Sequence, residues 1–289
     1  MIKSAKILVD NALEKFEESA NNNGITGIQT GFKKLDVLTN GWQAGDFIII
    51  AARPGMGKSQ FLFSMIKNIA IHNGDAVAFF SLEYSSHRII TKMISSETGI
   101  TIQRLEKGML DPQEWERINL KINNLYKSPI YIEDDLLSFS DFKEKASMLV
   151  ANYDVKLIVF DCIQYYRFSD LLSRSREEAI LEITQNLRNL AKELQVPIIT
   201  TSEISRQVEC REDSNRPILS DLRESELIEP LADIVCLIYR PEYYGISEWE
   251  DGSSSEGQAE LILAKHRNGG LDNIRLKFTG YLGEFSDLE

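Results

Sequence analysis

The chain has 289 residues, 43% hydrophobic and 26% charged, the proportions of a globular protein with one large domain or two small ones. A sizeable core can form at this length without disulfides or metals. The three cysteines include no CxxC pair and the three histidines are scattered, which excludes a disulfide framework and a cysteine zinc site. No apolar run approaches the ~18 residues of a membrane-spanning helix, and no signal-peptide core begins the chain. We therefore expect a cytoplasmic protein without a membrane partner.

Acidic residues outnumber basic ones. The chain has 44 Asp and Glu against 32 Lys and Arg, a formal net charge of −12. Nucleic-acid-binding domains usually carry a basic excess, so this balance argues against one. A ring-shaped assembly can line its channel with few basic residues per subunit, and the argument therefore leaves DNA binding open.

The first twenty residues have the pattern of an amphipathic helix. Apolar side chains recur there at close to 3.6-residue spacing, at Ile2, Ala5, Val9, Ala12, Phe16 and Ala20. A polar stretch over residues 21–24 then ends the helix. We therefore expect a linker helix and hinge over residues 1–23 and one domain over residues 24–289. The apolar stripe either folds back on this domain or docks on a neighbouring subunit.

Short apolar runs alternate with helical patterns from Gly24 onward. The expected strands are residues 47–50, 76–80, 130–132, 157–160, 197–201, 234–239 and 259–264. The expected helices are residues 58–71, 87–98, one that begins at the Asp111 capping box, 141–152 and 177–194. Residues 245–257 read as an exposed loop. This order predicts an α/β fold with a mainly parallel sheet covered by helices on both faces.

A phosphate-binding sequence lies between the first strand and the first helix of this domain: Ala52, Arg53, Pro54, Gly55, Met56, Gly57, Lys58 and Ser59. It matches the P-loop pattern, with alanine at the first glycine position. Backbone amides around the two glycines cup phosphate oxygens, and the helix adds its positive end. Lys58 then reaches the β- and γ-phosphates and the Ser59 hydroxyl ligates Mg²⁺, which predicts an ATP and Mg²⁺ site.

Two acids follow predicted strands. Asp161 comes directly after residues 157–160, where a P-loop enzyme needs a carboxylate near the metal. The alternative for Asp161 is a loop cap. Glu83 follows the strand that ends at Ser81, and it is the candidate base that orients the attacking water. By position alone Glu83 is equally well a solvated carboxylate.

Segments that follow one another in the same order from Gly24 to Gly269 resemble the ATPase domain of DnaB-type replicative helicases. The segments that carry the resemblance are residues 25–28, 30–32, 35–36, 51–58, 80–83, Asp161 with Gln164, 190–197, 220–225, 232–233 and 264–269. Alanine at the first P-loop glycine is a habit of that family. The resemblance implies a RecA-like P-loop core preceded by the family's linker helix, which docks on the adjacent subunit of a homo-hexamer. The family's separate N-terminal domain, which meets primase, has no counterpart in these 289 residues.

The resemblance also implies roles for residues that spacing alone does not assign. It supports ATP and Mg²⁺ at Lys58 and Ser59, Asp161 at the metal and Glu83 as the base. Lys265 and Arg267 match a pair that reaches into the next subunit's nucleotide site, with Arg267 as the arginine finger. Such a finger is worth ~10³ to 10⁵ in rate. Without the resemblance, Arg267 would read as a surface ion pair.

The same resemblance places single-stranded DNA against two channel loops. These are the loop after Ser202, which carries Arg206, and the segment with Arg223 and Glu224. Two further arginines precede the helix at residue 177 and are candidate DNA contacts, Arg174 and Arg176. A solvated helix start explains that last pair at least as well. The implied partners are single-stranded DNA, further copies of the chain, and a helicase loader or primase.

Two positions depart from the family pattern. Glu203 stands where the family usually has a sensor glutamine, and a carboxylate there repels a phosphate. Glu226 stands where the family usually has glycine, in the DNA-facing loop. Residues 203–216 carry three arginines against four acids, and residues 220–229 carry one arginine against four acids. Because phosphate binding needs cationic contacts, a motor requires these acids to be paired, protonated or distant from phosphate. Arg206 and Arg223 are the candidate partners.

These observations predict a ring helicase motor that hydrolyses ATP at subunit interfaces, translocates on single-stranded DNA and unwinds duplex during replication. One alternative is a RecA-type ATPase that is not a helicase, and residues 220–225 argue against it. The other alternative is a nucleotide-binding ring subunit that acts as a scaffold or accessory ATPase and no longer translocates. The two acidic departures support that second alternative.

Overall fold

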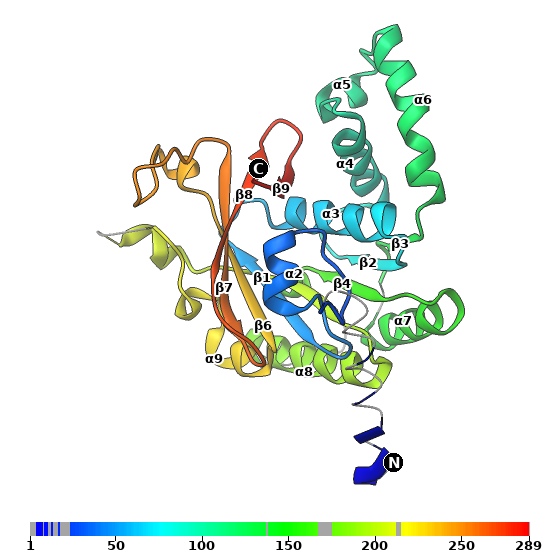
Figure 1. Ribbon diagram of the computed structural model, residues 1–289, viewed down its shortest axis with the longest axis vertical. Helices are drawn as coiled ribbons and strands as arrows, with labels where there is room; N and C mark the ends of the chain where they lie inside the picture. The colour runs from blue at the N-terminus through cyan, green and yellow to red at the C-terminus, as the bar shows by residue number, and fades with distance from the viewer. Residues whose placement is uncertain are drawn as a thin grey trace.

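A computed structural model describes residues 4–7, 9–10, 13, 17, 24–136, 138–166, 175–211 and 215–288. Within these ranges one nine-stranded sheet crosses the domain in the order β3-β2-β4-β5-β1-β6-β7-β8-β9 (Figure 1). The strands are β1 (Phe47–Ala52), β2 (Val77–Ser81), β3 (Ile130–Glu133), β4 (Leu157–Asp161), β5 (Ile198–Glu203), β6 (Ile234–Tyr239), β7 (Gln258–His266), β8 (Asn273–Thr279) and β9 (Glu284–Asp287).

The sheet has a parallel part and an antiparallel part. β3, β2, β4, β5, β1 and β6 are parallel neighbours. β7, β8 and β9 extend the sheet as antiparallel strands. The predicted mainly parallel α/β fold is confirmed. The last two strands were not expected. In β8, buried and more exposed residues alternate, so its sequence lacks the continuous apolar run of the central strands.

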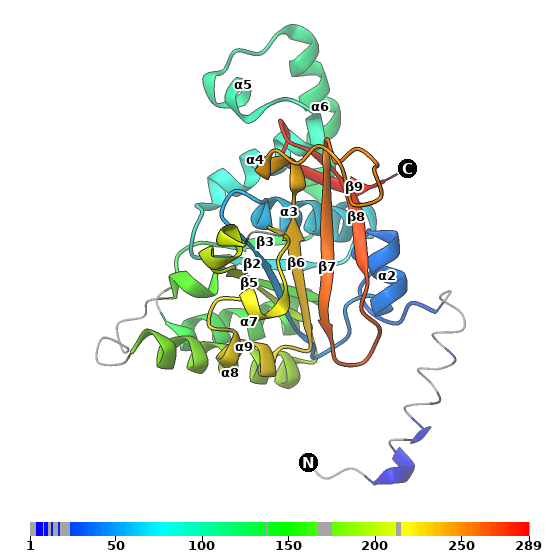
Figure 2. The same ribbon diagram turned by 90° about the vertical axis from the view of Figure 1, so that its left-hand side faces the viewer.

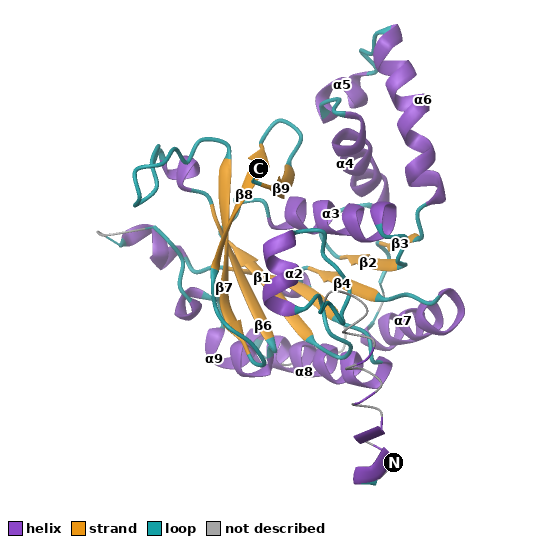
Figure 3. Ribbon diagram, in the orientation of Figure 1, coloured by secondary structure: helices purple, strands orange, loops and turns teal. Residues whose placement is uncertain are grey.

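Helices cover both faces of the sheet (Figure 3). The described helices are α2 (Lys33–Thr39), α3 (Lys58–Lys67), α4 (Ser86–Thr98), α5 (Ile102–Lys107), α6 (Pro112–Lys127), α7 (Phe139–Tyr153), α8 (Arg176–Leu194) and α9 (Ser225–Ile228). Every residue of β1 is buried, because Ile48 and Ile50 pack in the core under α3 while Phe47 and Ile49 pack in the core under α7 and α8. A strand buried on both faces reads as a continuous apolar run, which is why β1 was predictable.

Two of the expected helices can be compared in detail with the structure. The helix expected over residues 58–71 ends as an α-helix at Lys67 and continues as one π-helical turn over Asn68–His72. The expected capping box is present, since the Asp111 side chain accepts from the Glu114 amide at 2.8 Å and the Glu114 carboxylate accepts from the Asp111 amide at 2.9 Å. With α4 and α5, this capped helix forms a projection beyond the sheet (Figures 1 and 2).

The segment over residues 245–257 is largely an exposed loop, as expected, although Trp249 and Ser255 within it are buried. At the other end of the chain, residues 5–7 are helical, and the side chains of Ile7, Val9 and Leu13 are exposed. Most of the predicted apolar stripe lies outside the described residues. Within the described ranges, no helix has the length and apolar character needed to cross a membrane.

Candidate nucleotide and DNA site

The order of the strands brings the expected nucleotide residues to one edge of the sheet. β2, β4, β5 and β1 are consecutive parallel neighbours, so the loops that follow them leave from the same edge. Ala52 lies opposite Glu203 in the register, and Ser81 lies opposite Asp161. A cavity of about 200 Å³ opens there, and its lining comprises Arg53, Pro54, Gly55, Gly57, Lys58, Ser59, Gln60, Glu83, Tyr84, Cys162, Tyr165 and Glu203.

The other two expected P-loop residues, Ala52 and Met56, are fully buried in the core and shape the loop from below. Gly55 and Gly57 adopt positive φ angles of 82° and 102°, which residues with side chains rarely adopt. A Cβ atom at Gly57 would also lie 3.0 Å from the ring of Phe285. The loop therefore needs glycine for its conformation and for its close packing.

α3 begins at Lys58, directly after the loop, so the positive end of the helix lies at the cavity. The Lys58 ammonium donates to the Ala52 carbonyl at 3.3 Å, which keeps it beside the loop. Helix end, lysine and glycine-rich turn together form a site for the phosphates of a nucleotide.

Asp161 is completely buried beneath this site. Its carboxylate accepts a hydrogen bond from the Ser59 hydroxyl at 3.4 Å and another from the Thr201 hydroxyl. Burial raises the pKa of Asp161 to about 6, while the bond from Thr201 acts in the opposite direction. Mg²⁺ in nucleotide sites commonly takes one or two protein oxygens with waters and phosphates, and the Ser59 and Asp161 oxygens fit that need.

Glu83 lies two residues beyond β2 and is exposed at the cavity. The next residue, Tyr84, is half-buried, and its pKa is raised to about 12 by burial and then by the Glu83 charge. Hydrogen bonds of the Tyr84 hydroxyl with Glu83 and Ser59 also act on this pKa. The Lys92 ammonium lies 4.1 Å from the centre of the Tyr84 ring. Tyr84 thus interacts with both the candidate base and the candidate metal ligand.

Sequence reasoning missed Tyr84, Lys92 and Tyr165. Tyr84 adjoins Glu83 in the sequence, and that adjacency was a usable signal. Lys92 comes from α4 and meets Tyr84 only in the fold, and Tyr165 lines the cavity from the turn after β4. Neither position belongs to a motif, so the sequence alone gave no reason to choose them.

Three of the expected DNA residues meet at the end of β5. The Arg223 guanidinium pairs with Glu203 at 2.7 Å and with Glu224 at 3.3 Å. Arg176, at the start of α8, lies 3.7 Å from Glu224. Of the two candidate partners for Glu203, Arg223 is therefore the one that pairs with it. Glu226 is exposed in the first turn of α9.

Arg206 lies beside this group. It lines a second cavity of about 350 Å³ together with Arg53, Pro54, Glu203, Ile204, Ser205 and Arg223. Arg53 and Glu203 line both this cavity and the nucleotide cavity. The structure therefore places the expected DNA residues next to the nucleotide site. Arg174 lies outside the described residues.

Lys265 and Arg267 lie toward the opposite edge of the sheet. β7 runs antiparallel to β6, so its last residues pair with the first residues of β6. The Arg267 amide donates to the Asp233 carbonyl at 2.9 Å, and the Asp233 amide donates to the carbonyl of Phe47, the first residue of β1. Ala52 is five residues further along β1, roughly 16 Å at the usual rise per residue. Arg267 is thus separated from its own chain's P-loop by the length of a strand.

The side chains of this pair are held at the surface. The Arg267 guanidinium pairs with the Asp233 carboxylate at 3.1 Å and donates to the Pro230 carbonyl at 3.0 Å. The Lys265 ammonium donates to the Glu229 carbonyl at 2.5 Å, and partial burial lowers its pKa. The surface ion pair considered for Arg267 is present, and the Arg267 side chain is 43% exposed.

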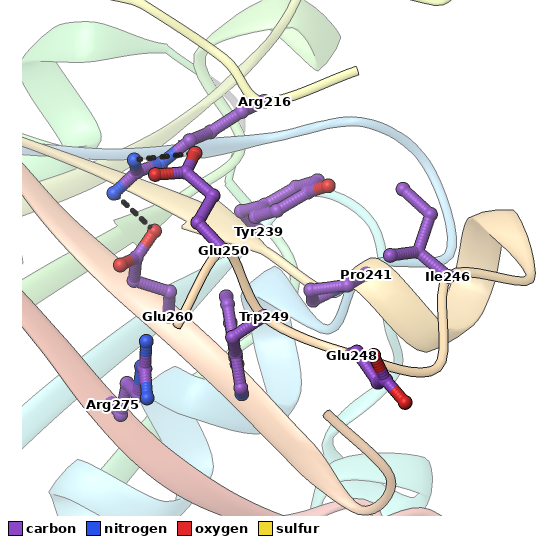
Figure 4. A pocket seen from close by; sticks show the side chains of 9 residues that line it. All are labelled: Arg216, Tyr239, Pro241, Ile246, Glu248, Trp249, Glu250, Glu260 and Arg275. Carbon is purple, nitrogen blue, oxygen red and sulfur yellow. Dashed lines mark ion pairs between the residues drawn. The ribbon is translucent and has the colours of Figure 1, made fainter. Parts of the chain in front are cut away.

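A separate cavity of about 220 Å³ lies under the 245–257 loop (Figure 4). Trp249 and Tyr239 form its aromatic part, with ring centres 6.3 Å apart. Arg275 stacks over Trp249 at 4.6 Å, and Arg216 pairs with Glu260 at 2.6 Å. These contacts join the loop to β6, β7 and β8. None of the residues expected to bind ATP or DNA lines this cavity.

Comparison with known proteins agrees with this geometry. Residues 27–287 match the model of the DnaB-like helicase C-terminal domain. The chain is 37% identical over 289 residues to the replicative DNA helicase DnaB of Geobacillus stearothermophilus, covering 99% of this chain and 62% of that protein. It is 36% identical over 278 residues to the replicative DNA helicase DnaC of Bacillus subtilis (strain 168), covering 96% of this chain and 60% of that protein.

Solved structures give the same result. A DnaB-like replicative helicase, studied with its interactions with primase, superposes with a TM-score of 0.85 at 32% identity, over all of this chain and 68% of that one. A second solved structure, of an ATPase domain alone, superposes with a TM-score of 0.87 at 33% identity, over 97% of this chain and 99% of that one. The chain spans about three fifths of the length of the curated relatives above. It belongs to the DnaB-like helicase C-terminal domain family.

Proposed function

We propose that this chain is the ATP-hydrolysing motor of a ring-forming helicase that translocates on single-stranded DNA and unwinds duplex during replication. The observation that carries the proposal is the separation of two parts of one catalytic site. The P-loop, Asp161 and Glu83 share one edge of the sheet, and Arg267 lies toward the other. A site completed by Arg267 therefore requires a second subunit.

In this proposal the residues around the 200 Å³ cavity bind and orient ATP. Lys58 and the start of α3 hold the phosphates, and the oxygens of Ser59 and Asp161 hold Mg²⁺. Mg²⁺ held by these oxygens would supply positive charge that offsets the negative charge of the phosphates. Glu83 orients the attacking water and accepts its proton. Asp161 serves as a metal ligand only when it is ionised, which its raised pKa of about 6 permits at neutral pH.

Arg267 and Lys265 supply the charge that a single chain lacks at the γ-phosphate. A cyclic homo-hexamer places the Arg267 edge of one subunit against the P-loop edge of the next, so that each site is shared. The Asp233 carboxylate and the Pro230 carbonyl hold the guanidinium in place until a neighbour's phosphate takes it. Hydrolysis then depends on assembly.

The N-terminal helix stabilises the ring in this proposal by docking its apolar stripe on the adjacent subunit. Val9 belongs to that stripe, and its side chain is exposed in the single chain, so this position is available to a partner. We also propose that a helicase loader or primase binds the assembled ring. A protein that acts on replicating DNA would work in the cytoplasm. Deletion of residues 1–20 should shift sedimentation from hexamer toward smaller species. A ring of unchanged stability would return the helix to its own domain.

The scaffold alternative has one observation in its favour. Glu203 and Glu224 both pair with Arg223, so the principal cation of that channel loop is already neutralised. A ring that binds ATP but has lost its grip on DNA would have this arrangement. The alternative differs from the motor in its response to DNA.

ATP turnover with and without single-stranded DNA separates the two functions. The measurement is made at protein concentrations where sedimentation shows a ring. A motor binds the DNA at low salt and changes its turnover when DNA is added. A scaffold binds nucleotide with turnover that ignores DNA, and that result would contradict the proposed translocation.

A further inference from the structure

Glu203 occupies the boundary between two cavities. It lines the 200 Å³ cavity with Lys58, Ser59 and Glu83, and it also lines the 350 Å³ cavity. Its backbone ends β5 directly opposite Ala52, at the base of the P-loop. A substitution of Glu203 therefore changes the charge of both cavities.

The larger cavity is rich in arginine. Arg53, Arg206 and Arg223 line it against one lining carboxylate, Glu203. The Arg53 guanidinium pairs at 2.8 Å with Glu209, which does not line the cavity, and it also donates to the Ile204 carbonyl at 3.0 Å. A concave surface with three guanidinium groups is suited to a phosphate, which accepts paired hydrogen bonds from arginine. This cavity thus has the chemistry of a phosphate site.

The Glu203–Arg223 ion pair stands in the way of such a ligand. The Glu203 carboxylate lies 2.7 Å from the Arg223 guanidinium, closer than the Glu224 carboxylate at 3.3 Å, and the Glu203 and Arg223 side chains remain 26% and 42% exposed. An ion pair of this exposure contributes little to stability, so the oxygens of a phosphate, which accept paired hydrogen bonds from a guanidinium, can replace the carboxylate.

The backbone lets this exchange occur without refolding. The Arg223 amide donates to the Glu203 carbonyl at 3.0 Å, and Ile204 and Leu222 form an antiparallel bridge. The Ser205 amide donates to the Asp221 carbonyl at 2.8 Å. These bonds hold the two segments side by side whichever group the Arg223 side chain contacts. The side chain is therefore the movable part.

We propose that the 350 Å³ cavity binds a phosphate group and that Glu203 is a gate on it, because the phosphate must take Arg223 from the Glu203 carboxylate. The phosphate comes from the DNA backbone or from a nucleotide, and its source rests on the function proposed above. The gate lowers the affinity of the cavity for phosphate. It also leaves the Glu203 charge facing the nucleotide cavity once Arg223 has moved.

The gate is tested on the assembled protein with Glu203→Gln, Arg223→Gln and the double variant. Affinity is measured by anisotropy of dye-labelled oligo-dT and, separately, by fluorescence of mant-ATP. Glu203→Gln should raise affinity ~10-fold for the ligand that uses the cavity, with a dependence on salt that is steeper by about one counterion. The double variant should lose this gain, because the released arginine is absent. Thermal melting checks that each variant is folded.

Asp251→Asn is the matched control. It removes the same charge and breaks a comparable ion pair, Asp251–Arg275 at 2.8 Å, away from both cavities. It should leave both affinities unchanged. An equal gain in this control would show a general charge effect and overturn the gate.

The remaining outcomes are also decisive. No gain for either ligand overturns the gate, and so does a gain that persists in the double variant, since Glu203 then acts by direct repulsion. A gain for oligo-dT that needs Arg223 supports the gate and assigns the phosphate to DNA. A gain for mant-ATP alone supports the gate and assigns the phosphate to the nucleotide. If no variant binds oligo-dT in that last case, the translocation proposal fails while the gate stands.

Discussion

The two ends of the parallel strands differ in what they carry. At the carboxyl ends of β2, β4, β5 and β1, a glycine-rich loop, two acids and a helix terminus surround one cavity. At the other end, Lys265 and Arg267 hold carbonyls and a carboxylate at the surface and line no cavity described above. The first end has a cavity that can hold a ligand, whereas the side-chain contacts described for Lys265 and Arg267 are with groups of their own chain. This difference fits our proposal that the second end acts on a neighbouring subunit.

The parallel and antiparallel parts of the sheet contribute differently to this division. The parallel strands supply the acids and the P-loop, while the pair that we propose to act in trans lies at the end of β7, with Lys265 in the strand and Arg267 one residue beyond it. The antiparallel strands also support the P-loop, because the ring of Phe285 in β9 packs closely against Gly57. A Cβ atom at Gly57 would lie 3.0 Å from that ring. One extension of the sheet therefore packs against the subunit's own P-loop and also carries the residues that we propose to act on a neighbour.

The largest expected effect comes from removing the lysine of the binding end. Lys58→Ala should abolish ATP hydrolysis, because the ammonium is the principal side-chain charge that the loop offers to the terminal phosphates. The fold should survive, since the hydrogen bond that the Lys58 ammonium makes within the described part of the chain, to the Ala52 carbonyl, is long at 3.3 Å. Steady-state turnover and thermal melting measure the two effects. Near-normal turnover in a folded variant would contradict the ATPase assignment.

The next effect breaks the other end. Arg267→Ala should lower turnover by ~10³ to 10⁵ and leave mant-ATP binding nearly unchanged, because the arginine acts on a neighbour's phosphate. Mixing Arg267→Ala with Glu83→Gln should restore some turnover, since mixed rings contain interfaces in which both groups are intact. Turnover per wild-type subunit should also rise with protein concentration. A complete lack of rescue, together with turnover that ignores concentration, would remove the shared site.

The sequence was sufficient to predict the P-loop and the acids at the carboxyl ends of the strands. It was not sufficient to predict which side chains at that end contact one another. The apolar runs of β1 and β4 and the glycines of the P-loop are local features, so the fold and the cavity followed from them. The partner of Glu203 was narrowed only to Arg206 or Arg223. Pairing depends on the register between β5 and the loop after Leu222, and neither spacing nor composition encodes that register.

A smaller effect concerns Asp161 and stability. Its pKa of about 6 in the fold exceeds the ordinary 3.8, so its contribution to stability is complete below pH 3.8 and is lost as pH rises through 6. Asp161→Asn, which keeps an acceptor for Thr201, should therefore raise the melting temperature at pH 7 in the absence of Mg²⁺ and nucleotide. The difference from wild type should shrink toward pH 4. A difference that is constant with pH would show that the ionised carboxylate carries no burial cost.

The smallest expected effect refines the binding end. The Tyr84 hydroxyl interacts with Glu83 and Ser59, and the Lys92 ammonium lies 4.1 Å from the centre of the Tyr84 ring. Tyr84→Phe keeps the ring and its cation–π contact and removes only the hydroxyl. If that hydroxyl positions Glu83, kcat should fall a few-fold, ~1 kcal/mol for one hydrogen bond, with KM for ATP nearly constant. Tyr281→Phe, on an exposed turn, is the control and should change neither constant. A rise in KM with kcat preserved would instead place the hydroxyl in nucleotide binding, because an interaction equal in ground and transition states changes KM alone.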